Sequence, residues 1–168
     1  TAPLDDTVLR QRMDHFAEQF EQELKAFCAA RGAEQVANLH DGMEFSLGTD
    51  IADPALRGKR IRPLLCLLSA EALGADPALA MPFALSIELM HNFALVHDDM
   101  QDGDIMRRGR DAAWIRYGVP HAINIGDYLL VHTGMALEKM RPEDALELES
   151  LLAEVQAAGT AGPVKRET

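Results

Sequence analysis

The side chains best suited to chemistry lie in one stretch near the middle of the chain, ELMHNFALVHDDMQDGDIMRRGR. Spacings of three and four residues place four of them, with Leu95, on one face of a helix: Glu88, His91, Asp98 and Asp102. Apolar residues surround this row, which predicts that the helix is buried on most sides. Because a carboxylate is rarely buried without a partner, the acidic row predicts bound cations.

Two kinds of cation can neutralise these acids. Asp98, Asp99 and Asp102 form the pattern DDxxD, whose first and last carboxylates lie one helical turn apart and can share divalent metal ions. Ligands made of oxygen suit Mg²⁺, which takes its other ligands from water and substrate phosphates. Arg107 and Arg108 follow, and guanidinium groups pair with phosphate through two parallel hydrogen bonds. The combination favours a diphosphate site over a zinc or nucleic-acid site.

A second basic cluster precedes this stretch. The segment RGKRIRP, residues 57–63, feeds a predicted helix that has Pro63 near its first turn. Lys59 and Arg62 therefore lie where free backbone N–H groups and the helix dipole favour phosphate. Alone, such a loop is more simply a solvated basic turn. Two basic clusters in a chain of formal charge −11 nevertheless favour a small anion over a polyanion such as nucleic acid.

The periodicity predicts a single all-α domain over residues 1–168. No strand pattern is found. We expect helices from the capping residues 5–7 to Gly32, over 34–45, over 64–73, from residue 79 or 82 to 100, over 114–117, over 121–139, and from Pro142 onward. We expect a loop over residues 102–109 and a frayed tail over residues 159–168.

The composition predicts a cytoplasmic protein. Cys28 and Cys66 lie in apolar helical stretches without zinc-ligand spacing, which predicts reduced core thiols. The apolar runs are too short or too often interrupted to predict a membrane span, and no signal peptide is visible.

Three motifs together resemble the polyprenyl synthetases, also called trans-isoprenyl diphosphate synthases. DDMQDGDIMRRG, residues 98–109, is similar to the family's first aspartate-rich motif DDxxDxxxxRRG. RGKRIRP resembles GGKRxRP, with Arg57 in place of the usual Gly, and Glu88 with His91 matches ExxH. The later AINIGDYLL resembles AINxGDxL. The resemblance covers about residues 10–155 and implies the N-terminal half of an isoprenoid-synthase-type helical bundle.

The resemblance implies an enzyme that condenses isopentenyl diphosphate head-to-tail with an allylic diphosphate. Asp98 and Asp102 would hold Mg²⁺ against the allylic diphosphate, supported by Asp99, and Arg107 would contact the same diphosphate. The isopentenyl diphosphate site would comprise Lys59, Arg62, His91 and Arg108. The catalytic set implied in this way is Asp98, Asp99, Asp102, Arg107 and Lys59.

The resemblance also bears on product length and assembly. In this family, residues one turn before the first aspartate line the floor of the product cavity, and here these are Phe93 and Ala94. A Phe at the fifth position upstream resembles the short-chain synthases, so we expect a C20 product, with C15 next. Plain core packing of Phe93 is the alternative. A homodimer is implied by the resemblance alone.

Three interpretations stay open. Family members are usually longer and carry a second aspartate-rich motif, which does not occur after residue 110. We favour a portion of a complete prenyltransferase. A noncatalytic or regulatory subunit that pairs with a complete synthase is the second interpretation, although such a module would not need all three aspartates and both arginines. The third, a helical interaction protein with a solvated acidic face, leaves the basic loop unexplained.

Overall fold

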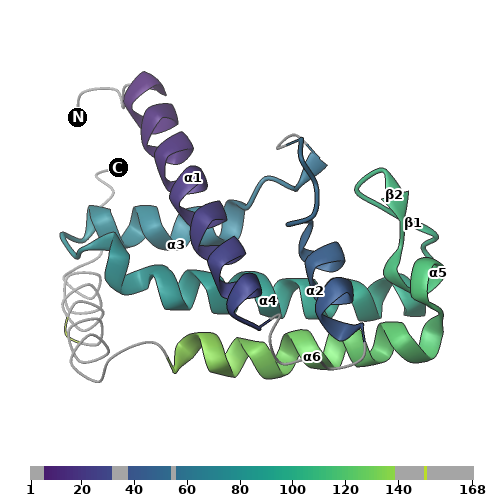
Figure 1. The fold of residues 1–168 in the computed structure, drawn as a ribbon. Coiled ribbons are helices and arrows are strands. Elements are labelled where there is room, and N and C mark those ends of the chain that lie inside the picture. Colours follow the sequence, from purple (N-terminus) through teal and green to yellow (C-terminus); the bar gives the residue numbers. More distant parts are fainter. Residues whose placement is uncertain (1–5, 32–37, 54–55, 139–149, 151–168) are drawn as a thin grey trace, which may run out of the picture.

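The computed structural model describes residues 6–31, 38–53, 56–138 and 150 as a helical bundle (Figure 1). Its helices are α1 (Asp6–Arg31), α2 (Leu39–Leu47), α3 (Ile61–Ala72), α4 (Pro77–Asp102), α5 (Ala113–Tyr117) and α6 (Val119–Leu137). The predicted all-α class is confirmed. The predicted last helix and the C-terminal tail lie outside the described residues.

One short strand pair lies within this helical fold, where the sequence shows no strand pattern. β1 (Met106–Arg107), inside the predicted loop, pairs antiparallel with β2 (Arg110–Asp111), which follows it. Arg108 and Gly109 connect them, with φ of 54° and 77°. Positive φ at both turn residues is the signature of the tight hairpin turn that matches strand twist. Two-residue strands carry no alternating pattern, so periodicity could not predict them.

Helix α4 is the axis of the bundle. In Figure 1 it runs the length of the molecule, with α6 alongside it and α3 on another side, and these two helices make its most extensive contacts. It begins earlier than predicted because the carboxylate of Asp76 accepts a hydrogen bond from the Ala78 N–H at 2.9 Å and Pro77 occupies the first turn. Gly103, at φ 72°, ends it.

Within the described residues, α4 is also long and apolar enough, by length and composition, to cross a membrane. Core helices of soluble proteins pass the same test. Because α4 packs against α3 and α6, its contacts here are those of a core helix.

Helix α1 crosses the bundle and supplies much of the core. Its buried residues follow helical spacing: Phe16, Phe20, Leu24, Phe27 and Cys28. Burial raises the pKa of the Cys28 thiol to about 12 and that of Cys66 to about 11, so both stay protonated at neutral pH. The two thiols are free, as predicted. Helix α2 begins at Leu39; the predicted start near residue 34 lies outside the described residues.

The close approach of α4 and α6 depends on Gly126. A Cβ on Gly126 would lie 2.7 Å from Nδ1 of His97, whereas a Cβ on Gly134 of the same helix would meet nothing within 4 Å. We expect Gly126→Ala to lower the free energy of unfolding by about 1–3 kcal/mol through overpacking. Gly134→Ala should raise it by about 0.5–1 kcal/mol because alanine restricts the unfolded chain.

Urea denaturation of the two variants beside the parent protein measures this difference. Equal effects of the two substitutions would show that α6 does not pack on His97 as described.

Candidate functional site

A cavity of about 410 Å³ lies between the loop before α3, the middle of α4 and the β1–β2 hairpin. It collects most of the predicted anion ligands. The residues that line it are Gly58, Lys59, Arg60, Ile61, Arg62, Glu88, His91, Leu95, Arg107 and Arg108. The structure thus brings together the four residues of the predicted isopentenyl diphosphate site, from segments about fifty residues apart in sequence.

His91 and Arg62 contact each other on the cavity wall. Arg62 Nη1 lies 3.1 Å from His91 Nε2, so the ring nitrogen can accept this hydrogen bond in the neutral tautomer. Burial, and then the positive charge of Arg62, lower the pKa of His91. The imidazole therefore stays neutral at physiological pH, and Arg62 keeps its charge available for an anion.

Arg108 is held by two hydrogen bonds. Its guanidinium donates to the Ser46 carbonyl at 3.3 Å and to Oδ1 of Asn92 at 3.2 Å. Gly58 leaves room for it, since a Cβ there would lie 3.3 Å from Arg108 Nε. Burial, followed by repulsion from Arg60, lowers the pKa of Arg108, as expected for a desolvated cation among like charges. An anion in this cavity would relieve that repulsion.

Arg60 has a structural role that the sequence did not reveal. Its side chain is 3% exposed and donates to Glu21 at 2.7 Å, to Glu88 at 2.6 Å and to the Leu47 carbonyl at 2.7 Å. It therefore ties α1 and α2 to the middle of α4. The sequence predicted partners for a buried Glu88, which is confirmed, but could not say which basic residue would turn inward.

The three acids of the DDxxD pattern differ in burial, and this corrects the prediction that the acidic row is buried. Asp99, which lies off the predicted row, is the buried one and accepts from Arg107 Nε at 2.9 Å. This contact raises the pKa of Arg107. Asp98 and Asp102 are exposed rather than surrounded by apolar side chains. They lie in the last turns of α4, on a side of the helix that the described residues do not bury.

Asp98 and Asp102 fit a magnesium site in which the protein supplies only two carboxylate ligands. In the described part of the chain, no group of three His, Cys, Asp or Glu side chains is arranged to hold a metal ion. Two carboxylates one turn apart still suit Mg²⁺, which commonly keeps waters and binds substrate phosphates. Asp99 is engaged by Arg107 and is less suited to bind a metal.

Phe93 and Ala94 lie partly buried one turn before Asp98. The Phe93 ring packs against His97, with 4.7 Å between centroids, and His97 Nδ1 lies 3.1 Å from the Phe93 carbonyl.

Asp127 is mostly exposed, 3.9 Å from His97 Nε2. Arg57 donates to two carbonyls of the preceding segment, Ile51 and Ala52, at 2.6 Å each, so it ties this loop together.

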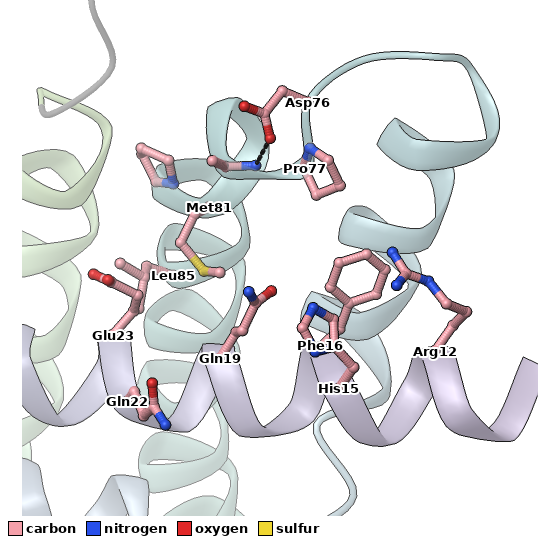
Figure 2. A pocket seen from close by; sticks show the side chains of 12 residues that line it. Arg12, His15, Phe16, Gln19, Gln22, Glu23, Asp76, Pro77, Met81 and Leu85 are labelled. Atoms are coloured by element: carbon pink, nitrogen blue, oxygen red, sulfur yellow. Dashed lines mark hydrogen bonds between the residues drawn. The ribbon is translucent and has the colours of Figure 1, made fainter.

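A larger cavity, of about 540 Å³, lies elsewhere. It separates α1 from the first turns of α4, and Figure 2 shows Gln19 and Phe16 of α1 facing Pro77 and Met81. Arg12 at its rim is engaged by Glu71. Its mixed lining gathers none of the predicted ligands. Size alone therefore does not identify the site.

Helix α4 thus carries both residues that line the basic cavity and, near its end, two exposed aspartates one turn apart. The family model for polyprenyl synthetase matches residues 49–164, and the chain belongs to this family. A geranylgeranyl pyrophosphate synthase from Geoglobus acetivorans is 45% identical over 100 residues, covering 58% of this chain and 31% of the relative.

Two further comparisons agree. A farnesyl diphosphate synthase from Geobacillus stearothermophilus is 41% identical over 114 residues, covering 64% of this chain and 38% of the relative's length. The solved structure of the geranylgeranyl pyrophosphate synthetase from Geoglobus acetivorans matches with a TM-score of 0.68 at 34% identity, covering 85% of this chain and 44% of that one. The chain therefore spans less than half the length of these relatives.

Proposed function

We propose that the chain is the diphosphate-binding portion of a prenyltransferase that condenses isopentenyl diphosphate with an allylic diphosphate. The observation that carries the proposal is the cavity shared by Lys59, Arg62, His91 and Arg108, beside the DDxxD end of α4. Four side chains that can donate to or charge-pair with phosphate line one space of about 410 Å³. Family membership supports the same chemistry.

Asp98 and Asp102 would hold Mg²⁺ against the allylic diphosphate, with Asp99 positioning Arg107 next to them. Bound magnesium would neutralise charge on the departing diphosphate. Arg107, fixed by Asp99, would direct its remaining N–H donors to the diphosphate oxygens where negative charge develops as the carbon–oxygen bond breaks. Lys59, Arg62 and Arg108 would hold isopentenyl diphosphate by its diphosphate, leaving its alkene free to attack the allylic carbon.

The expected setting follows from the family. We propose a cytoplasmic enzyme that acts as a homodimer, binds no nucleic acid and has no membrane span in this portion. A noncatalytic or regulatory subunit that pairs with a complete synthase is the second candidate. The intact mass of the protein and the assay below separate the two.

A condensation assay tests the proposal. Labelled isopentenyl diphosphate is incubated with C5, C10 and C15 allylic diphosphates, with and without Mg²⁺, and labelled products are separated by length. An enzyme gives longer products that disappear with chelator and return with added Mg²⁺. No product with any primer, although inorganic pyrophosphate binds, would favour the noncatalytic subunit.

Product length is expected to depend on Phe93. We propose a C20 product, with C15 next, because the Phe93 ring is braced by His97 and takes up space beside α4. Phe93→Ala removes most of an aromatic side chain and should lengthen the product by at least one C5 unit. Chromatography of products from both proteins measures this. Met90→Ala, at an exposed side chain of the same helix, serves as the control substitution. An unchanged product length would assign Phe93 to core packing.

A further inference from the structure

Asn92 is a buried residue that the proposed chemistry does not use. It lies on α4, one position after His91, and is 1% exposed. Its Nδ2 donates to the Glu88 carbonyl at 2.8 Å and to Glu88 Oε1 at 3.0 Å. Both of these partners are acceptors, so the amide orientation is fixed by chemistry: the NH₂ group faces Glu88 and the oxygen faces away.

The oxygen of Asn92 faces Arg108. Arg108 Nη2 donates to Asn92 Oδ1 at 3.2 Å, and Arg108 Nη1 donates to the Ser46 carbonyl at 3.3 Å. Both acceptors are neutral. Arg107 and Arg60 differ, because each donates to a carboxylate that cancels much of its charge. Arg108 is thus held in place without being neutralised.

Holding matters because arginine loses about 2 kcal/mol of rotamer entropy when one conformation is fixed. A guanidinium that is already fixed loses less when a ligand binds, which increases affinity. Asn92, which positions Arg108, is itself fixed by Glu88. Glu88 receives Arg60 Nη1 at 2.6 Å as well as the Asn92 amide, so the support for Arg108 extends through Asn92 and Glu88 to a buried arginine.

We infer that Asn92 is a positioning residue that aims the charged Arg108 guanidinium at a diphosphate in the cavity. This rests on the proposed function only in naming the ligand as an isoprenyl diphosphate. Asn suits the position better than Asp, because a carboxylate would lie close to Glu88 Oε1 and would also neutralise Arg108. Leu would fill the space but leave Glu88 and Arg108 without their partner.

A double-mutant cycle tests the inference, with the dissociation constant for inorganic pyrophosphate measured by calorimetry in the presence of Mg²⁺. Asn92→Ala should weaken binding about tenfold, the size expected for a hydrogen bond to a charged group. In an Arg108→Ala background, the same substitution should change binding less than about twofold, because its partner is gone. Equal weakening in both backgrounds, or none in either, overturns the inference.

The kinetic readout separates positioning from folding. With isopentenyl diphosphate as the varied substrate, Asn92→Ala should raise KM about tenfold and leave kcat within about twofold. Thr133→Val is the matched control: Thr133 is a buried helical side chain that bonds the carbonyl four residues before it, on α6 away from the cavity. The control should leave KM unchanged.

A second variant covers the case in which Asn92→Ala fails to fold. Asn92→Ser keeps a hydroxyl that can donate to the carbonyl four residues before it, as Ser46 does to Gly42 at 2.8 Å, but it is too short to reach Arg108. It should show the same tenfold weakening. If the parent protein binds no pyrophosphate, the proposed function fails; if it binds and both Asn92 variants match it, only the role of Asn92 fails.

Discussion

Alanine in place of Asp98 or Asp102 is expected to lower the rate of condensation by about 10²–10³-fold, the loss typical when one electrostatic stabiliser of a transition state is removed. Both side chains are exposed near the end of α4. Their removal should therefore change the free energy of unfolding by no more than about 0.5 kcal/mol. The rate falls because the carboxylates would hold magnesium against the departing diphosphate.

The measurement compares turnover at saturating substrates and Mg²⁺ binding by calorimetry in the presence of inorganic pyrophosphate. Asp41→Ala, which removes an exposed carboxylate from α2, is the matched control and should leave both quantities unchanged. Undiminished turnover in Asp98→Ala would refute the metal assignment. Lost turnover with unchanged Mg²⁺ binding would instead give the aspartates a role in substrate binding.

Replacing Arg60 by Met is expected to destabilise the protein by about 3–5 kcal/mol. The reason is burial: Glu88 is 3% exposed, and with Arg60 absent its carboxylate loses the cation 2.6 Å away. Glu21, which Arg60 reaches from the other side at 2.7 Å, is also left without this partner. A loss of this size is a large part of the stability of a small domain.

Urea and thermal denaturation measure the effect. Arg12→Ala is the comparison, because the Arg12–Glu71 pair is more than a third exposed on both sides and should contribute about 1 kcal/mol or less. Adding Glu88→Gln to Arg60→Met should recover part of the loss, since a neutral amide is less costly to bury than a carboxylate. Equal losses for Arg60→Met and Arg12→Ala would show that Arg60 is not buried.

Much of the architecture could be predicted from sequence because its signals are local. Phe16, Phe20 and Leu24 repeat at helical spacing, and Gly74 and Asp76 lie at the boundary between α3 and α4. The gathering of Lys59 and Arg62 with His91 was predicted from motifs and is found in one cavity. Local sequence patterns specify which residues form helices and which helix faces are polar.

The remainder depends on tertiary contacts. Sequence could not show that Asp99 would be buried and Asp98 exposed. The two residues are adjacent in one helical turn, and what distinguishes them is which other elements pack against each side of that turn. Nor could it show that Arg60 would turn inward while Lys59 stays exposed. The role of Asn92 had one local signal, its spacing of four from Glu88, but its contact with Arg108 joins α4 to the hairpin.

The backbone at two arginines has a consequence for selection experiments. Arg60 and Arg108 have φ of 48° and 54°, a left-handed conformation that costs a side-chain-bearing residue about 1–2 kcal/mol and glycine almost nothing. A library screened only for resistance to proteolysis should therefore enrich glycine at position 108. Position 60 should keep arginine in the same screen, because buried Glu88 and half-buried Glu21 both pair with it. Only a screen for catalysis would retain both.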